Sequence, residues 1–81
     1  MKPVLIYSTP NCHFCHAAKE FFKEKNVPFT DFDVSVDKER RSEMIDKTGQ
    51  LGVPVIDIDG DIMVGFNKPM VAKLLGINLE N

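Results

Sequence analysis

The sequence lacks a long apolar run and lacks an excess of positive charge. Its longest aliphatic run is Val4-Leu5-Ile6, followed by Tyr7, whereas a membrane span needs about 20 apolar residues and a signal peptide about 7–15. Ten Lys and Arg residues stand against twelve Asp and Glu residues, which leaves a net charge of −2. This balance excludes a strongly basic nucleic-acid binder and a polybasic membrane anchor. We therefore expect a cytoplasmic chain that binds neither nucleic acids nor membranes.

Internal repeats, low-complexity tracts and recognisable linkers are also absent from the sequence. Its 81 residues suffice for one small domain, because domains rarely fall below about 50 residues. Apolar residues make up 43% of the sequence, and together with the low net charge this composition favours a folded domain over a disordered segment. We expect a single domain over residues 1–81 that remains a monomer.

Cysteine is scarce, and the two cysteines present, Cys12 and Cys15, are separated by only two residues. A secreted domain of this size usually carries about four to eight cysteines as a disulfide framework. A disulfide between Cys12 and Cys15 would close a very short loop, so it would restrict the unfolded chain little. The pair is thus predicted to serve chemistry rather than stability.

The periodicity of apolar residues predicts strands and helices in the order β-α-β-α-β-β-α. Strands are predicted where apolar residues run together or alternate, at Val4–Tyr7, Phe29–Val34, Val55–Ile58 and Ile62–Gly65. Helices are predicted from Cys12 to about Lys25, after Asp37 up to Gly49, and from Asn67 up to Gly76. The Asp59-Gly60 dipeptide predicts a type I′ hairpin between the last two strands. We therefore expect an α/β fold with a four-stranded mixed sheet covered by three helices.

Each predicted helix has one face that carries its apolar residues. In the first helix this face contains Cys15, Ala18 and Phe22, with Phe14, Ala17 and Phe21 beside it. In the second and third helices the inward stripes are predicted as Arg41, Met44, Ile45 and Thr48, and as Met70, Val71, Leu74 and Leu75. Asp37 is predicted to cap the second helix, and Asn26 to end the first in a left-handed conformation.

The two cysteines are predicted to differ in chemistry because they occupy different positions on the first helix. Cys12 lies at the helix N-terminus, where free backbone N–H groups and the helix dipole favour an anion. We therefore expect the pKa of the Cys12 thiol to fall below its ordinary value of about 8.5. Cys15 lies one turn further, on the apolar face, and is expected to remain a protonated, shielded thiol. These positions predict that Cys12 attacks a substrate disulfide and that Cys15 resolves the mixed disulfide.

The residues beside the cysteines are candidates for tuning and docking. His13 would add positive charge near the Cys12 thiolate when it is protonated. Phe14 would offer an aromatic surface to a substrate, and His16 is expected on the exposed flank of the helix. The alternative for all three is an ordinary solvated or packing side chain.

Three other interpretations of the cysteine pair remain open. Cys12 to His16 match the C-x-x-C-H signature of c-type haem attachment, and four methionines could supply an axial ligand. Such attachment generally accompanies export, for which the sequence shows no signal. Two Cys and two His are zinc-ligand types, but these four lie within five consecutive residues and cannot all face one ion. Two buried thiols without chemistry are the third interpretation.

Dithiol exchange is favoured over these alternatives. A C-x-x-C motif near a βαβ pattern in a cytosolic chain is typical of redox-active dithiols. We therefore expect a redox-active pair and no bound metal or haem.

Four segments of the sequence, in this order, resemble the glutaredoxins and the glutaredoxin-like redoxins: Val4-Leu5-Ile6-Tyr7, Cys12-His13-Phe14-Cys15, Gly52-Val53-Pro54 and Gly65-Phe66. The resemblance covers nearly the whole chain and implies a thioredoxin-like fold, in agreement with the element order. It also implies a cis Val53-Pro54 bond that faces the cysteines, with the Val53 backbone offered to an extended substrate. The substrate groove is then expected to comprise His13, Phe14, Gly52, Val53, Pro54, Gly65 and Phe66.

Three departures from the glutathione-using members bear on the electron source. Those members often carry a Lys three residues before the first Cys, where this sequence has Thr9, and a Thr before the Val-Pro pair, where it has Gly52. At the position where an Asp or Ser receives the glutathione amino group, this sequence has Lys68, whose charge would repel that group. Gly65-Phe66 followed by Pro69 is more similar to redoxins that thioredoxin reductase reduces, some of which deliver electrons to ribonucleotide reductase.

The residues and the resemblance together predict a thiol–disulfide oxidoreductase that reduces protein or small-molecule disulfides. No bound cofactor is expected, and the electrons are expected to come from NADPH through an enzyme of the thioredoxin reductase type. A glutathione-dependent glutaredoxin is the alternative within the family, and a metal-binding or iron–sulfur carrier module is the alternative outside enzymes. The expected partners are disulfide-containing proteins, among them ribonucleotide reductase, and either thioredoxin reductase or glutathione.

Overall fold

The computed structural model describes residues 2–77, whose elements follow the predicted order β-α-β-α-β-β-α. The strands are β1 (Val4–Ser8), β2 (Thr30–Asp33), β3 (Val55–Ile58) and β4 (Asp61–Val64). The helices are α1 (His13–Glu24), α2 (Lys38–Thr48) and α3 (Lys68–Leu75). Every predicted strand and helix is present, and the predicted α/β fold with a four-stranded mixed sheet and three helices is confirmed.

The four strands form one mixed sheet in the order β2-β1-β3-β4. β1 runs parallel to β2 and antiparallel to β3, and β3 pairs antiparallel with β4. The Asp59-Gly60 turn joins β3 to β4, and its residues have φ values of 50° and 94°, as a type I′ hairpin requires. β1 and β3 are therefore the central strands, and helices cover both of their faces, so almost all of their residues are buried.

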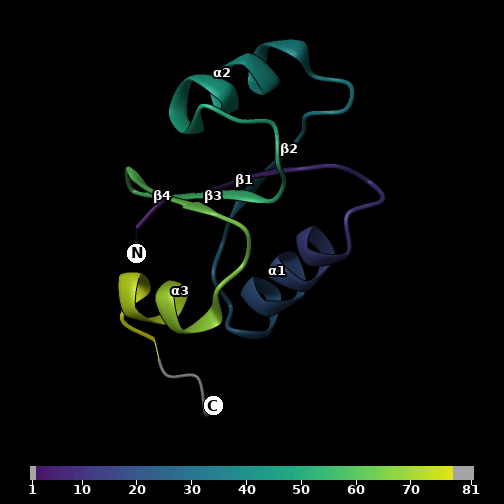
Figure 1. Cartoon of the computed structure of the whole chain (residues 1–81). Coiled ribbons are helices and arrows are strands. Elements are labelled where there is room, and N and C mark those ends of the chain that lie inside the picture. The colour runs from purple at the N-terminus through teal and green to yellow at the C-terminus, as the bar shows by residue number, and fades with distance from the viewer. Residues whose placement is uncertain (1, 78–81) are drawn as a thin grey trace.

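Helices cover both faces of the sheet, with α1 and α3 on one face and α2 on the other (Figure 1). Successive side chains of a strand point to opposite faces. Ile6 therefore joins an apolar cluster with Phe22 of α1 and Val71 of α3, whereas Tyr7 joins a cluster with Met44 of α2. The larger cluster anchors α1, the helix that carries both cysteines.

The helix ends follow the signals predicted from the sequence. Asp37 and Asn67 cap α2 and α3, and their side-chain oxygens accept backbone N–H groups of the first turn. Gly49 and Gly76 close the same two helices in the left-handed conformation. Asn26, just after α1, also has a positive φ of 56°. Local side-chain chemistry thus sets where these helices begin and end.

The predicted inward stripe of α2 is wrong at Ile45, which is 37% exposed. Met44 is the buried residue of this helix. Charged side chains of α2, Glu43 and Lys47, turn toward the sheet and bond to polar groups there. Apolar periodicity identifies the inward face of a helix only when that face is apolar. It therefore did not predict that these charged side chains contact the sheet.

The predicted inward stripe of α3 is wrong at Met70, which is 45% exposed. The buried residues of α3 are Val71 and Ala72, so the buried face is rotated by one position along the sequence. Leu74 and Leu75 pack partly buried against the core, as predicted. Within residues 2–77, the helices are all too short or too polar to cross a membrane.

Candidate functional site

The strand register brings three separate loops together at one end of the sheet. Tyr7 pairs with Val55, and Val55 pairs with Val64. The chain after β1, the chain before β3 and the chain after β4 therefore meet there. The backbone N–H of Gly65 donates to the carbonyl oxygen of Pro54 at 2.8 Å. The cysteine loop, the Val-Pro segment and the Gly-Phe segment, far apart in the sequence, are neighbours in the fold.

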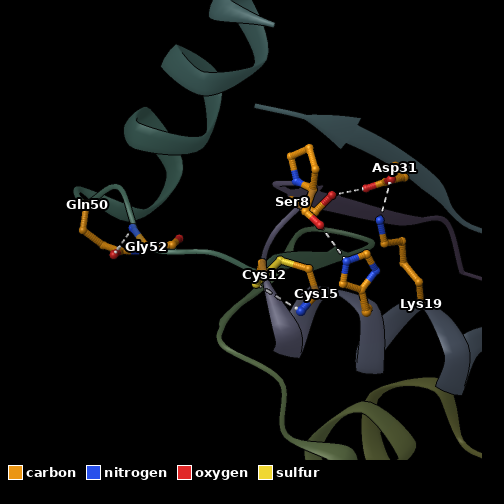
Figure 2. Close-up of a disulfide and its surroundings, with 9 residues drawn as sticks. Ser8, Cys12, Cys15, Lys19, Asp31, Gln50 and Gly52 are labelled. Atoms are coloured by element: carbon orange, nitrogen blue, oxygen red, sulfur yellow. Dashed lines mark hydrogen bonds and ion pairs between the residues drawn. A yellow bond between two sulfur atoms is a disulfide. The ribbon is translucent and has the colours of Figure 1, made fainter. Parts of the chain in front are cut away.

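Cys12 and Cys15 lie at the start of α1 and form a disulfide, with their Cα atoms 5.2 Å apart. Cys12 is the N-cap of α1, and its Sγ atom accepts the backbone N–H of Cys15 at 3.1 Å (Figure 2). Cys12 is partly exposed, whereas Cys15 is 0% exposed. The more accessible of the two cysteines is therefore also the one whose sulfur receives a helix N–H group.

Two hydrogen bonds hold the loop that leads to Cys12. The Cys12 N–H donates to the Thr9 carbonyl oxygen at 3.3 Å, and Nε2 of His16 donates to the Pro10 carbonyl oxygen at 2.7 Å. His16 is exposed, as predicted, but its ring bridges α1 and the loop. The sequence alone does not indicate this contact, because it depends on where the carbonyl of Pro10 points.

A polar group of three residues joins β1, β2 and α1 beside the disulfide (Figure 2). The hydroxyl of buried Ser8 donates to Oδ1 of Asp31 at 2.6 Å, and Nζ of Lys19 lies 3.0 Å from Oδ2 of Asp31. Ser8 is the last residue of β1, so the group fixes the point from which the cysteine loop departs. None of these three residues was among the predicted site residues.

The Val53-Pro54 peptide bond is cis, as the resemblance to glutaredoxins implied. Pro54 is buried, Val53 is half-buried and Gly52 is exposed. The Gln50 side chain bonds both backbone groups of Gly52: Oε1 accepts the N–H at 2.6 Å, and Nε2 donates to the carbonyl oxygen at 3.3 Å (Figure 2). Gln50 was not predicted, because a polar residue in a loop carries no signal of such a contact.

Gly65 and Phe66 follow β4 and lead into α3. Gly65 has a φ of +87°, which favours glycine at this bend. The Phe66 ring packs partly buried against Phe21 of α1, with ring centroids 5.6 Å apart. Nζ of Lys68 lies 5.9 Å from the centroid of the Phe21 ring. The segment after β4 is thus attached to the helix that carries the cysteines.

His13 and Phe14, between the two cysteines, are exposed. Their rings make an edge contact with centroids 5.8 Å apart, and Phe14 is 62% exposed. This exposure is what an aromatic docking surface requires. Within residues 2–77, no group of three or more His, Cys, Asp or Glu side chains is arranged to hold a metal ion.

A second polar group lies between α2 and the sheet, and apolar periodicity does not reveal it. Nζ of Lys47 lies 2.6 Å from Oδ2 of Asp57 and donates to the Tyr7 hydroxyl at 2.7 Å. The Tyr7 hydroxyl donates in turn to Glu43, which pairs with Arg40 at 3.0 Å. Tyr7 is 0% exposed and Asp57 is 7% exposed. These bonds attach α2 to both central strands.

The charge states of this group are mutually supporting. Burial and then the hydrogen bond to Glu43 raise the pKa of Tyr7. The hydrogen bond from Tyr7 is the largest cause that holds the pKa of Glu43 below its ordinary value of 4.5. Burial favours the neutral amine of Lys47, but hydrogen bonds to Asp57 and Tyr7 outweigh it and raise the pKa of Lys47. A neutral phenol, a carboxylate and an ammonium group are therefore the stable set.

Comparisons with known proteins bear on this site. The glutaredoxin family model matches residues 4–63. An uncharacterized glutaredoxin-like 8.6 kDa protein in the rubredoxin operon of Clostridium pasteurianum is 50% identical over 72 residues, which cover 89% of this chain and 96% of that protein. A mutant of the thioredoxin-like protein BC3987 has a crystal structure that superposes with a TM-score of 0.89 at 33% identity, covering 96% of this chain and 100% of that one.

The NrdH-redoxin of Escherichia coli, described as a glutaredoxin-like protein with a thioredoxin-like activity profile, superposes with a TM-score of 0.77 at 25% identity. That superposition covers 89% of this chain and 93% of the other. The segment that matches the family model contains the Cys12–Cys15 pair and the cis Val53-Pro54 bond, and it ends before Gly65-Phe66. With this pair and this bond on a thioredoxin-like fold, the chain belongs to the glutaredoxin family of dithiol–disulfide oxidoreductases.

Proposed function

We propose that the chain is a redoxin in which Cys12 is the attacking thiolate and Cys15 the resolving thiol. The observation that supports these roles is the difference between the two sulfurs. Cys12 is partly exposed and accepts the Cys15 N–H, whereas Cys15 is buried. A helix N–H that points at a sulfur stabilises the thiolate relative to the thiol. An accessible thiolate can reach a disulfide on another molecule, and a shielded neighbour can then displace that molecule.

The proposed reaction moves two electrons to the substrate. The Cys12 thiolate attacks one sulfur of the substrate disulfide, so that a bond to Cys12 forms, the substrate S–S bond breaks and the leaving thiolate takes up a proton. Cys15 then loses its proton and attacks the Cys12 sulfur. This step forms the Cys12–Cys15 disulfide and releases the second substrate thiol. A dithiol donor returns two electrons to the protein by the reverse exchange.

The proposed substrate groove is formed by residues of the three loops at one end of the sheet. These residues are His13, Phe14, Gly52, Val53, Pro54, Gly65 and Phe66. In this groove the Val53 backbone offers one N–H and one C=O to an extended substrate, as in strand addition. Exposed Phe14 offers apolar area beside the reactive sulfur.

The electron donor in this proposal is an enzyme of the thioredoxin reductase class. Lys68 places a positive charge where a bound glutathione would place its amino group, and Thr9 stands where glutathione-using members carry a cation. The likeness to the NrdH-redoxin supports the same choice. The electrons then come from NADPH without a bound cofactor. The acceptor is a protein disulfide, such as that of ribonucleotide reductase, and the chain acts as a single-domain, monomeric electron carrier of the cytoplasm.

Two parallel NADPH-oxidation assays with a small disulfide test this choice. One contains glutathione and glutathione reductase, and the other contains only thioredoxin reductase. We expect turnover in the second assay alone. A variant that combines Thr9→Lys with Lys68→Asp should gain about fivefold or more in the glutathione assay, because it restores the two charges that favour glutathione. Lys73→Asp, on the exposed side of α3, is the matched control and should gain nothing.

A glutathione-dependent glutaredoxin is the second candidate, and the match of the glutaredoxin family model over residues 4–63 favours it. Turnover of the unmodified protein in the glutathione assay alone would select this candidate. Turnover in neither assay, despite reactive thiols, would contradict both candidates and favour a metal or iron–sulfur carrier, which would be coloured or metal-loaded as purified.

A further inference from the structure

The segment between α2 and β3 leads to the cis Val53-Pro54 bond, but it has no regular structure over residues 50–53. In the part of the chain from 2 to 77, none of the N–H groups of residues 50–53 donates to a backbone carbonyl. Side chains hold the segment instead. The conformation in front of the cis bond therefore depends on specific residues rather than on a strand or a helix.

These side-chain bonds run from the end of α2 to the residue before Val53. Oγ1 of Thr48 lies 2.8 Å from the Met44 carbonyl oxygen and accepts the Gln50 N–H at 3.3 Å. The Gln50 side chain then reaches forward and bonds both backbone groups of Gly52, at 2.6 and 3.3 Å. The last turn of α2 is thus connected to Gly52 through two side chains.

Gly52 is matched to Gln50 by size. A Cβ atom at Gly52 would lie 2.5 Å from Oε1 of Gln50, closer than Cβ atoms approach other atoms in proteins. Gly52 does not have a positive φ, so its backbone does not require glycine. A larger residue at position 52 would displace the Gln50 amide from the space beside it, so the contact between Gln50 and position 52 depends on glycine. This contact gives a physical reason for glycine at a position where glutathione-using members carry threonine.

We propose that Gln50 is a positioning residue that holds Gly52 and Val53 ready to pair with an extended peptide carrying the substrate disulfide. This inference rests on the function proposed above. Val53 precedes a proline and is therefore restricted to extended conformations. In an extended chain the backbone N–H and C=O groups of one residue point to one edge, and those of the next residue point to the opposite edge. The Gln50 side chain bonds the backbone groups of Gly52 on one edge, so the backbone groups of Val53 remain available on the other edge. No residue within 2–77 bonds the backbone N–H or C=O of Val53.

A comparison of two disulfide substrates tests the proposal. One is a peptide dimer joined by a single disulfide, which has a backbone that can pair with Val53. The other is bis(2-hydroxyethyl) disulfide, which has none. Stoichiometric reduction by the pre-reduced protein measures both second-order rate constants without any electron-donor system.

Gln50→Met and Gln50→Glu are the informative variants. Met has nearly the size of Gln but forms no comparable hydrogen bonds, so Gln50→Met should lower the rate constant for the peptide about five- to tenfold. The rate constant for the small disulfide, the alkylation rate of Cys12 and the melting temperature should stay unchanged. Gln50→Glu retains an oxygen acceptor for the Gly52 N–H, the shorter of the two bonds, and should retain most of the peptide rate.

A double-mutant cycle links the effect to the contact between Gln50 and Gly52. Gly52→Ala should lower the rate constant for the peptide as Gln50→Ala does, because the new methyl group displaces the Gln50 amide. The double variant should be no slower than either single variant, since all three lack the same contact. Additive losses would overturn the proposal.

The remaining outcomes are also decisive. Equal losses for both substrates in Gln50→Met would show a general structural role and overturn the positioning role, as would an unchanged peptide rate. Failure of the unmodified protein to reduce the small disulfide would instead contradict the proposed function itself. The two failures are therefore distinguishable in one set of measurements.

Discussion

Cys12 and Cys15 are identical side chains three positions apart, and the start of α1 makes them different. Cys12 caps the helix, is partly exposed and receives an N–H group, whereas Cys15 has turned into the core. At the residue scale, the proposed division into attacking and resolving thiols follows from backbone position alone. The side chains between them, His13 and Phe14, remain outside.

The division of roles predicts opposite behaviour for two serine variants. Cys15→Ser should accumulate a stable mixed disulfide at Cys12, because a serine hydroxyl near neutral pH is too weak a nucleophile to release the substrate. Cys12→Ser should form no adduct, since Cys15 is 0% exposed. Intact-mass spectrometry after incubation of each reduced variant with a small disulfide measures this. An adduct on Cys15 in the Cys12→Ser variant would show that the roles are assigned wrongly.

At the scale of elements, the helices are attached to the sheet by different physics. α1 buries Ala18, Phe21 and Phe22 in the larger apolar cluster. α2 instead places Lys47 on Asp57 and the Tyr7 hydroxyl, with Met44 as its buried residue. A polar attachment of this kind depends on each partner, because a buried group left unpaired costs more than the bond contributed.

Removing Lys47 from this attachment should therefore destabilise the protein. Lys47→Met leaves Asp57, 7% exposed, without its ammonium partner, and we expect a loss of about 1–3 kcal/mol in the free energy of unfolding. Lys73→Met is the matched control, because Lys73 also lies in the last turn of a helix but forms no hydrogen bond or ion pair with residues 2–77; its effect should stay within about 0.5 kcal/mol. Urea unfolding of the reduced proteins measures both. Equal losses in the two variants would contradict a structural role for the Lys47 contacts.

At the scale of the whole molecule, the same group makes stability depend on pH at both extremes. The pKa values of Tyr7 and Lys47 are raised in the fold, so their stabilising contribution is complete below the ordinary values of 10.0 and 10.5 and is lost as pH rises through the higher folded values. The pKa of Glu43 is lowered in the fold. Its contribution is complete above the ordinary value of 4.5 and is lost as pH falls through the lower folded value.

The free energy of unfolding should therefore be highest between these limits and decline on both sides. Tyr7→Phe removes one of the two groups that titrate at alkaline pH, so the loss of stability with rising pH should become shallower. The variant also removes the hydroxyl that donates to Glu43, so the loss of stability with falling pH should become shallower as well. Urea unfolding at a series of pH values, at constant ionic strength, gives the two slopes. Slopes that match those of the unmodified protein would show that the Tyr7 hydrogen bonds do not couple to folding.

Local features of this protein are determined by the sequence itself. Strand and helix ends were predicted to within one residue, because caps and turns act between residues a few positions apart, as Asp37 and Asp59-Gly60 illustrate. The position of Cys12 at a helix N-terminus is also a local property. The cis Val53-Pro54 bond was predicted only from the resemblance in motifs. Local sequence rules do not predict it, because only a small minority of peptide bonds before proline are cis.

The tertiary structure alone decided how the distant parts meet. Tyr7 bonds Glu43 and Lys47, which lie 36 and 40 positions away, and no periodic pattern marks such polar pairs. Gln50 bonds a residue only two positions away, but the loop shape that permits it is set by α2 and β3, which hold its two ends. Propensities and caps are short-range, whereas these contacts depend on the orientation of elements that pack together only when the whole chain folds.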